Sequence, residues 1–151
     1  MTRSLLHDTH THLEMLLEKL KIGENFRDYE YSKKSQNQIS LQLNQEQKSA
    51  IDEALINHQF VIQSTLSTDN FDLVWQLFKA NPKIFFLLGS HPEIVNEGFN
   101  LEIYISKQNQ YLAEISPSKL CGIGEAGLDY HYTKKTDLIE LQKKLDRKSV
   151  V

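Results

Sequence analysis

The chain has 151 residues, of which 40% are hydrophobic and 25% charged, with a formal net charge of −3. This balance is typical of one ordinary soluble domain and argues against a disordered, collagenous or repeat protein. A slightly acidic chain also lacks the basic surplus of proteins that bind nucleic acid by charge alone, so action on a phosphodiester would need bound cations. No apolar run approaches the roughly 20 residues of a membrane span. A single cysteine, Cys121, excludes an internal disulfide and favours a reducing cytoplasm.

The first predicted element is a strand over residues 5–12, a short and partly β-branched run bracketed by polar residues. Residues 14–45 are polar and irregular, and we expect a surface insertion there that contains a short helix near 15–21. Apolar residues at helical spacing predict a helix over 45–57. Residues 60–65, which begin with three apolar residues, are predicted to form the second strand.

The same alternation of strand and helix continues after residue 65. Thr68 and Asp69 are expected to cap a helix that ends before Pro82, and residues 84–88 are expected to form a buried strand closed by Gly89. The later predicted elements are a helix over 101–115, a strand over 120–125 and a helix from Thr136 onward. Four strand–helix units with nearly continuous apolar strands favour an α/β protein with a parallel sheet.

The sharpest local signal for chemistry is the run Asp8-Thr9-His10-Thr11-His12. Because side chains alternate along a strand, Asp8, His10 and His12 are expected on one face. Two imidazoles about 6–7 Å apart along a strand can bend toward a single metal ion. Asp8 would then orient a ring N–H from behind the ligands. Chance is the other interpretation, because a chain with 6 histidines often contains some His-x-His, and both stay open at this point.

Two further signals lie just past predicted strands. Glu125 stands in the glycine-rich run Gly122–Tyr130, at the strand end where α/β folds build their sites; the alternative is a turn with a solvated carboxylate. The Gly-x-Gly-x-x-Gly pattern in this run does not open a helix, which excludes a dinucleotide site. His91 is expected to contact a substrate phosphate or to support a metal ligand, and the alternative is a turn residue held by Pro92.

Taken together, three motifs in order at three strand ends resemble the TatD family of metal-dependent deoxyribonucleases, a branch of the amidohydrolase superfamily. The last motif is the most specific to this family, and the first would also suit the wider superfamily. The resemblance covers most of the chain apart from residues 14–45. The matching segments are Asp8–Glu14, Leu88–Pro92 and Gly122–Tyr130.

The resemblance implies a TIM barrel with two divalent ions (zinc, manganese or magnesium) at the C-terminal mouth of its strands. It implies that His10 and His12 hold one ion and that Glu125 bridges both. It also implies supporting roles, behind the ligands or at the substrate, for His91 and Asp129, beside the role inferred above for Asp8. At one position the chain departs from the family, because Glu14 replaces the shorter aspartate that usually follows the histidine pair.

The length of the chain limits the predicted fold. A TIM barrel typically needs ~250 residues, so we expect one truncated domain over residues 1–151, a partial barrel of about the first four βα units of a (β/α)8 fold. The family's remaining ligands, including its catalytic aspartate, would lie beyond the end of the chain. Two exposed sheet edges would favour self-association.

The predicted function is metal-dependent hydrolysis of DNA phosphodiester bonds in the cytoplasm by two metal ions, with no membrane partner. The incomplete set of ligands is expected to weaken or abolish activity of this chain alone. Two alternatives stay open. One is a catalytically inactive remnant that binds at most one metal ion, and the other is a hydrolase of another amidohydrolase branch that acts on an amide or lactone.

Overall fold

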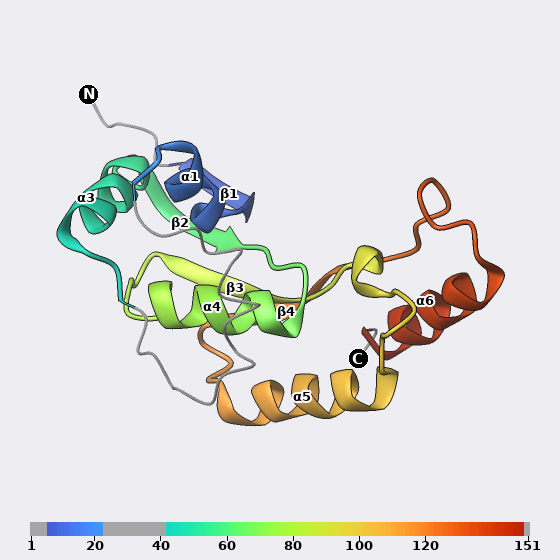
Figure 1. Cartoon of the computed structure of the whole chain (residues 1–151). Helices are drawn as coiled ribbons and strands as arrows, with labels where there is room; N and C mark the ends of the chain where they lie inside the picture. The colour runs from blue at the N-terminus through green and yellow to red at the C-terminus, as the bar shows by residue number, and fades with distance from the viewer. Residues whose placement is uncertain (1–5, 23–41, 150–151) are drawn as a thin grey trace. The chain divides into compact units, whose positions relative to one another are not determined.

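The computed structural model describes residues 6–22 and 42–149, and its strands and helices alternate along the chain (Figure 1). The elements are β1 (Leu6–Thr11), α1 (Leu13–Lys19), α3 (Gln45–Ala54), β2 (His58–Gln63), α4 (Thr68–Phe78), β3 (Ile84–Ser90), the 3₁₀ turn η1 (Pro92–Ile94), α5 (Leu101–Glu114), β4 (Leu120–Ala126) and α6 (Thr136–Ser149). Each predicted strand and helix is present, with bounds shifted by a few residues.

Helix α1 confirms the short helix predicted within residues 14–45, whereas residues 23–41 of that predicted insertion lie outside the described part of the chain. Helix α1 buries Leu13 and Leu17 on one face. No helix in the described ranges has both the length and the apolar character needed to cross a membrane.

The four strands are parallel and lie in the order β1-β2-β3-β4. In the first pair, Asp8 lies opposite Val61 and Thr11 opposite Gln63, with an irregularity between these two positions. Parallel neighbours joined by helices in chain order are the arrangement of part of a TIM barrel. The predicted fold class is therefore confirmed.

Contacts between residues divide the chain into two compact units, residues 1–63 with 72–85 and residues 64–71 with 86–151. In the first unit, helix α3 begins at a capping box in which Asn44 and Gln47 satisfy each other's backbone N–H groups. The buried apolar side chains of the first unit include Ile51, Val61 and Ile84. Burial of such side chains is the main stabilising term for the unit.

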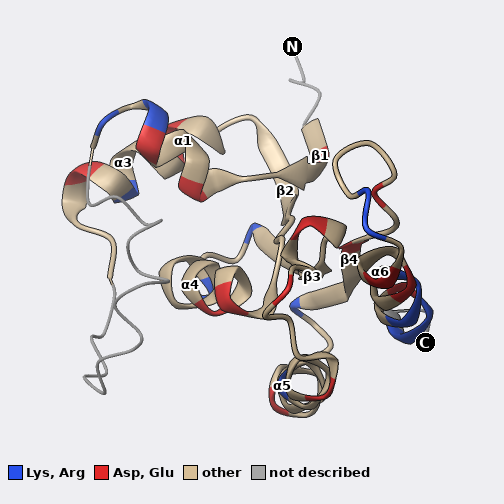
Figure 2. Cartoon of the chain, turned by 45° about the vertical axis from the view of Figure 1, so that its right-hand side comes forward, with Lys and Arg blue, Asp and Glu red and all other residues tan. Residues whose placement is uncertain are grey.

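The second unit contains a cluster around Val95, Tyr104 and Leu145, which joins α5 to α6. The hydroxyl of Tyr104 donates to the carbonyl of Gly89. Burial raises the pKa of Tyr104 to about 12, so this phenol stays a donor at neutral pH. Helix α6 carries Asp137 in its first turn and Arg147 in its last turn, which suits the helix dipole. Figure 2 shows that this helix carries both acidic and basic residues.

The start of α4 differs from the prediction. Thr68 is the first helical residue, not the cap. The carbonyl of Ser67 accepts from the Phe71 N–H (2.8 Å) and its hydroxyl accepts from the Asn70 N–H (3.1 Å). The side chain of Asn70 in turn accepts from the Leu66 N–H at 3.1 Å. Ser67 takes the capping role because its short hydroxyl reaches the first free backbone donors.

Candidate metal centre

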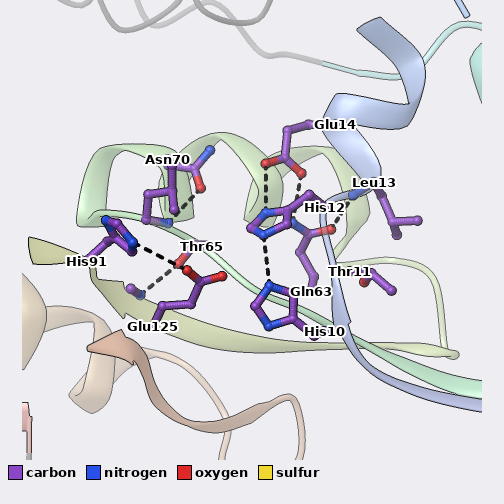
Figure 3. Close-up of polar contacts among 12 residues, drawn as sticks. His10, Thr11, His12, Leu13, Glu14, Gln63, Thr65, Asn70, His91 and Glu125 are labelled. Atoms are coloured by element: carbon purple, nitrogen blue, oxygen red, sulfur yellow. Dashed lines mark hydrogen bonds and ion pairs between the residues drawn. The ribbon is translucent and has the colours of Figure 1, made fainter. Parts of the chain in front are cut away.

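The predicted pair of histidines lies where β1 passes into α1. His10 is near the end of the strand, and His12 occupies the position before the first helical residue of α1. The strand is irregular here and ends at Thr11, so simple alternation does not describe the pair. The two rings nevertheless face each other, with their Nε2 atoms 3.3 Å apart (Figure 3).

This spacing suits a shared metal ion. Two imidazole nitrogens that bind one tetrahedral zinc at ~2.0–2.1 Å lie about 3.3–3.4 Å apart, and the two Nε2 atoms already have that separation. The His10 side chain is exposed and His12 is partly so, which leaves the pair open to an ion. Neutral imidazole is a common ligand of zinc and other divalent metals.

A buried polar network stands behind His12. Glu14 on α1 is 4% exposed, and its Oε1 lies 3.7 Å from His12 Nδ1. Its Oε2 accepts a hydrogen bond from Gln63 Nε2 at 2.8 Å, and Gln63 Oε1 accepts from the backbone N–H of Leu13 at 2.8 Å. Gln63 lies at the end of β2 and is fully buried. The network therefore ties the start of α1 to the neighbouring strand (Figure 3).

In the second unit, Glu125 near the end of β4 lies close to His91, which follows β3. His91 Nε2 is 3.8 Å from Glu125 Oε2. The backbone N–H of Glu93 donates to His91 Nδ1 at 3.3 Å. A neutral ring that accepts at Nδ1 carries its proton on Nε2, so the N–H of His91 is directed at the carboxylate of Glu125.

Residues 7–148 match the family model described as TatD related DNase. The chain belongs to the TatD related DNase family. No curated protein matches it. Membership confirms the predicted family and indicates, in general terms, a metal-dependent hydrolase of the nuclease type. Both pairs, His10 with His12 and His91 with Glu125, lie within the matched range.

Two other residues predicted for the TatD site make local contacts. Asp8 accepts a hydrogen bond from the backbone N–H of His10 at 3.0 Å, which holds the strand next to the histidine pair. Asp129 organises the loop after β4. One of its oxygens accepts from the N–H groups of His131 and Tyr132, and the other accepts from the N–H and hydroxyl of Thr133. Asp129 thus supports the loop that follows Glu125.

Gln63 stands in none of the motifs of this TatD family member, and Glu14 is notable in the sequence only as a departure from the family pattern. The signal for Gln63 was weak but present, since it is a polar residue that directly follows the apolar run Phe60-Val61-Ile62 at the end of its strand. A polar side chain buried at the C-terminal end of a parallel strand is where such folds place functional groups. Its partner, Glu14, lies 49 residues earlier in the chain.

Proposed function

We propose that this chain binds a divalent metal ion through His10, His12 and Glu125 and hydrolyses DNA phosphodiester bonds at that ion. The observation that carries the proposal is the 3.3 Å separation of the two histidine Nε2 atoms. Glu125 supports it by its place near the C-terminal end of another strand of the same parallel sheet. The C-terminal ends of parallel barrel strands together form one face, on which TIM-barrel active sites lie.

The donor set has the right chemistry for this role. Two imidazoles and a carboxylate suit zinc or manganese, and magnesium favours the carboxylate. When bound, divalent ions supply the positive charge that stabilises a phosphodiester under attack, and they activate water. Because Glu125 has two oxygens, it would also be available to help hold a second ion, which would supply the charge stabilisation of two-ion phosphodiester hydrolysis. An acidic chain with a net charge of −3 needs such cations to hold DNA.

The chain's own residues orient these ligands. His91 lies with its Nε2 3.8 Å from Oε2 of Glu125, where it can help to orient the carboxylate. Asp8 fixes the backbone of His10. Asp129 holds the loop directly after Glu125. Because these contacts already hold the proposed ligands in place, little conformational entropy is lost when an ion binds.

The single free cysteine, Cys121, supports a reducing, cytoplasmic location for the reaction.

The test measures zinc binding and DNA cleavage in the same variants. His10→Ala, His12→Ala and Glu125→Gln should each weaken zinc binding, measured by competition with a chromophoric chelator. Each should also lower cleavage of an end-labelled single-stranded oligonucleotide by at least about 100-fold if the metal carries the chemistry. His58→Ala is the matched control, because His58 lies at the opposite end of β2 from Gln63. It should change neither measurement.

Two results would contradict the proposal. If His10→Ala binds zinc with the affinity of the wild type, the proposed metal site is wrong. If the wild-type chain binds zinc but cleaves no DNA in a metal-dependent way, the metal site stands and the proposed hydrolysis is contradicted. This result would favour the alternative of an inactive, metal-binding protein.

A further inference from the structure

Glu14 is the only charged side chain among the described residues that is buried, at 4% exposure. Burial of a carboxylate is costly unless hydrogen bonds or charges compensate it. One of its oxygens, Oε2, accepts from Gln63. The other, Oε1, is shielded from solvent and accepts no hydrogen bond from any residue of the described ranges. It lies 3.7 Å from Nδ1 of His12.

The orientation of the Gln63 amide is determined by its surroundings. Gln63 Oε1 accepts from the backbone N–H of Leu13, which can only donate. The amide NH₂ must therefore face Glu14, where it donates to Oε2 at 2.8 Å. Because this donor occupies one carboxylate oxygen, the other is left facing His12. The backbone N–H of Leu13 therefore sets the orientation of the fully buried Gln63 amide, and this amide in turn sets the orientation of the Glu14 carboxylate.

His12 presents its two ring nitrogens to different partners. Nε2 faces His10 at 3.3 Å, and Nδ1 faces Glu14 at 3.7 Å. An acceptor beside Nδ1 favours the tautomer with hydrogen on Nδ1, which leaves the lone pair of Nε2 available for a ligand. A carboxylate behind a metal-binding histidine also makes the ring a stronger donor to the metal.

We infer that Glu14, fixed by Gln63, is a positioning residue that selects the Nδ1–H tautomer of His12 and so prepares Nε2 to bind a metal ion. Glu14 is not a ligand in this arrangement, because its carboxylate lies at the Nδ1 edge of the ring and not at the Nε2 edge. The inference rests on the proposed metal site, but the tautomer itself can be measured in metal-free protein.

The first measurement is long-range ¹H–¹⁵N NMR of the histidine rings in the metal-free chain, above about pH 8, where histidine is neutral. The signal of His12 is assigned by its loss in His12→Ala. We expect the wild-type ring to carry its proton on Nδ1. A wild-type ring with the proton predominantly on Nε2 would overturn the inference, whatever any variant does.

The second measurement repeats the NMR and a zinc competition titration on Glu14→Gln. The new amide must turn its oxygen to the NH₂ of Gln63, so its own NH₂ faces His12 Nδ1 as a donor. The tautomer should then switch to Nε2–H, and zinc affinity should fall by roughly 10- to 100-fold. Glu14→Asp keeps the charge on a shorter side chain, so its zinc affinity should lie between those of the wild type and Glu14→Gln. Glu53→Gln removes an exposed carboxylate from α3 and is the matched control.

The outcomes separate this inference from the proposed function. An unchanged tautomer and zinc affinity in Glu14→Gln would overturn the positioning role. If Glu14→Gln does not fold, the wild-type tautomer and Glu14→Asp still decide. A wild-type chain that binds no zinc but carries its His12 proton on Nδ1 would contradict the proposed metal centre and would support only the selection of the His12 tautomer by Glu14.

Discussion

Asp129 shows how one side chain can order a loop next to a candidate site. Its two carboxylate oxygens accept four hydrogen bonds, all from residues 131–133. These bonds, above all the one from the Tyr132 N–H, hold the pKa of Asp129 below its ordinary value of 3.8. The charged form is therefore the one that the folded loop favours.

The lowered pKa of Asp129 gives a pH-dependent contribution to stability. A carboxyl group whose pKa is depressed by folding stabilises the fold above its unfolded pKa, and this stabilisation is lost as the pH falls through the folded pKa. Asp129→Asn should be less stable than the wild type at neutral pH. The difference in free energy of unfolding, measured by urea titration, should shrink once the pH falls below 3.8. A difference that stays constant between pH 7 and pH 3 would contradict this assignment.

At the scale of elements, close approach between β3 and the segment after β2 depends on Gly89. Its backbone N–H donates to Thr65 Oγ1 at 2.7 Å, and that hydroxyl donates to the Leu87 carbonyl at 2.7 Å. A Cβ atom at position 89 would lie 1.9 Å from the backbone oxygen of Thr65. Only glycine allows the two backbones to come this close.

Gly89→Ala is therefore expected to be strongly destabilising, by about 3 kcal/mol or more, because backbone must move to relieve the clash. Gly122→Ala in β4 is the matched control. Its added Cβ would meet only Leu87 Cδ2, at an ordinary contact distance of 3.7 Å, and should change stability by less than about 1 kcal/mol. Thermal or urea denaturation of the two variants checks this. Equal free energies of unfolding for Gly89→Ala and Gly122→Ala would show that β3 and the segment after β2 can move apart without loss of stability.

At the scale of the whole molecule, the strand order leaves β1 and β4 at the edges of the sheet formed by residues 6–22 and 42–149. Leu6 in β1 is 53% exposed, and Cys121 in β4 is also exposed. Unpaired backbone groups on an edge strand can pair with another chain. Open edges, together with exposed apolar side chains, favour association between copies.

We therefore expect the purified chain to self-associate. Light scattering over a dilution series should give a mass above 17.5 kDa that falls on dilution. Leu6→Lys should reduce this association, because a charged side chain on an edge strand opposes pairing with another chain. A concentration-independent monomer that unfolds cooperatively would contradict the prediction.

The sequence by itself determined the order of the elements and the local parts of the site. Short apolar runs and helical spacings were sufficient to predict four strand–helix units, since both patterns are local. The closeness of His10 and His12 was predictable for the same reason, because two residues of separation on extended chain place their rings within reach. Glu125 was singled out by its place at a strand end together with the resemblance of its motif to the family, and its role as a ligand stays a prediction.

Only the tertiary structure decided what stands behind the two histidines. Gln63 reaches Glu14 because the register of β1 and β2 sets Thr11 opposite Gln63, and no local pattern encodes that register. The irregularity between Asp8 and Thr11, in the part of β1 that contains His10, is likewise a feature of the strand pairing. Pairing between strands depends on backbone hydrogen bonds and burial that join distant parts of the chain, and the Gln63–Glu14 contact joins residues 49 positions apart. The buried carboxylate at His12 is therefore a product of the fold.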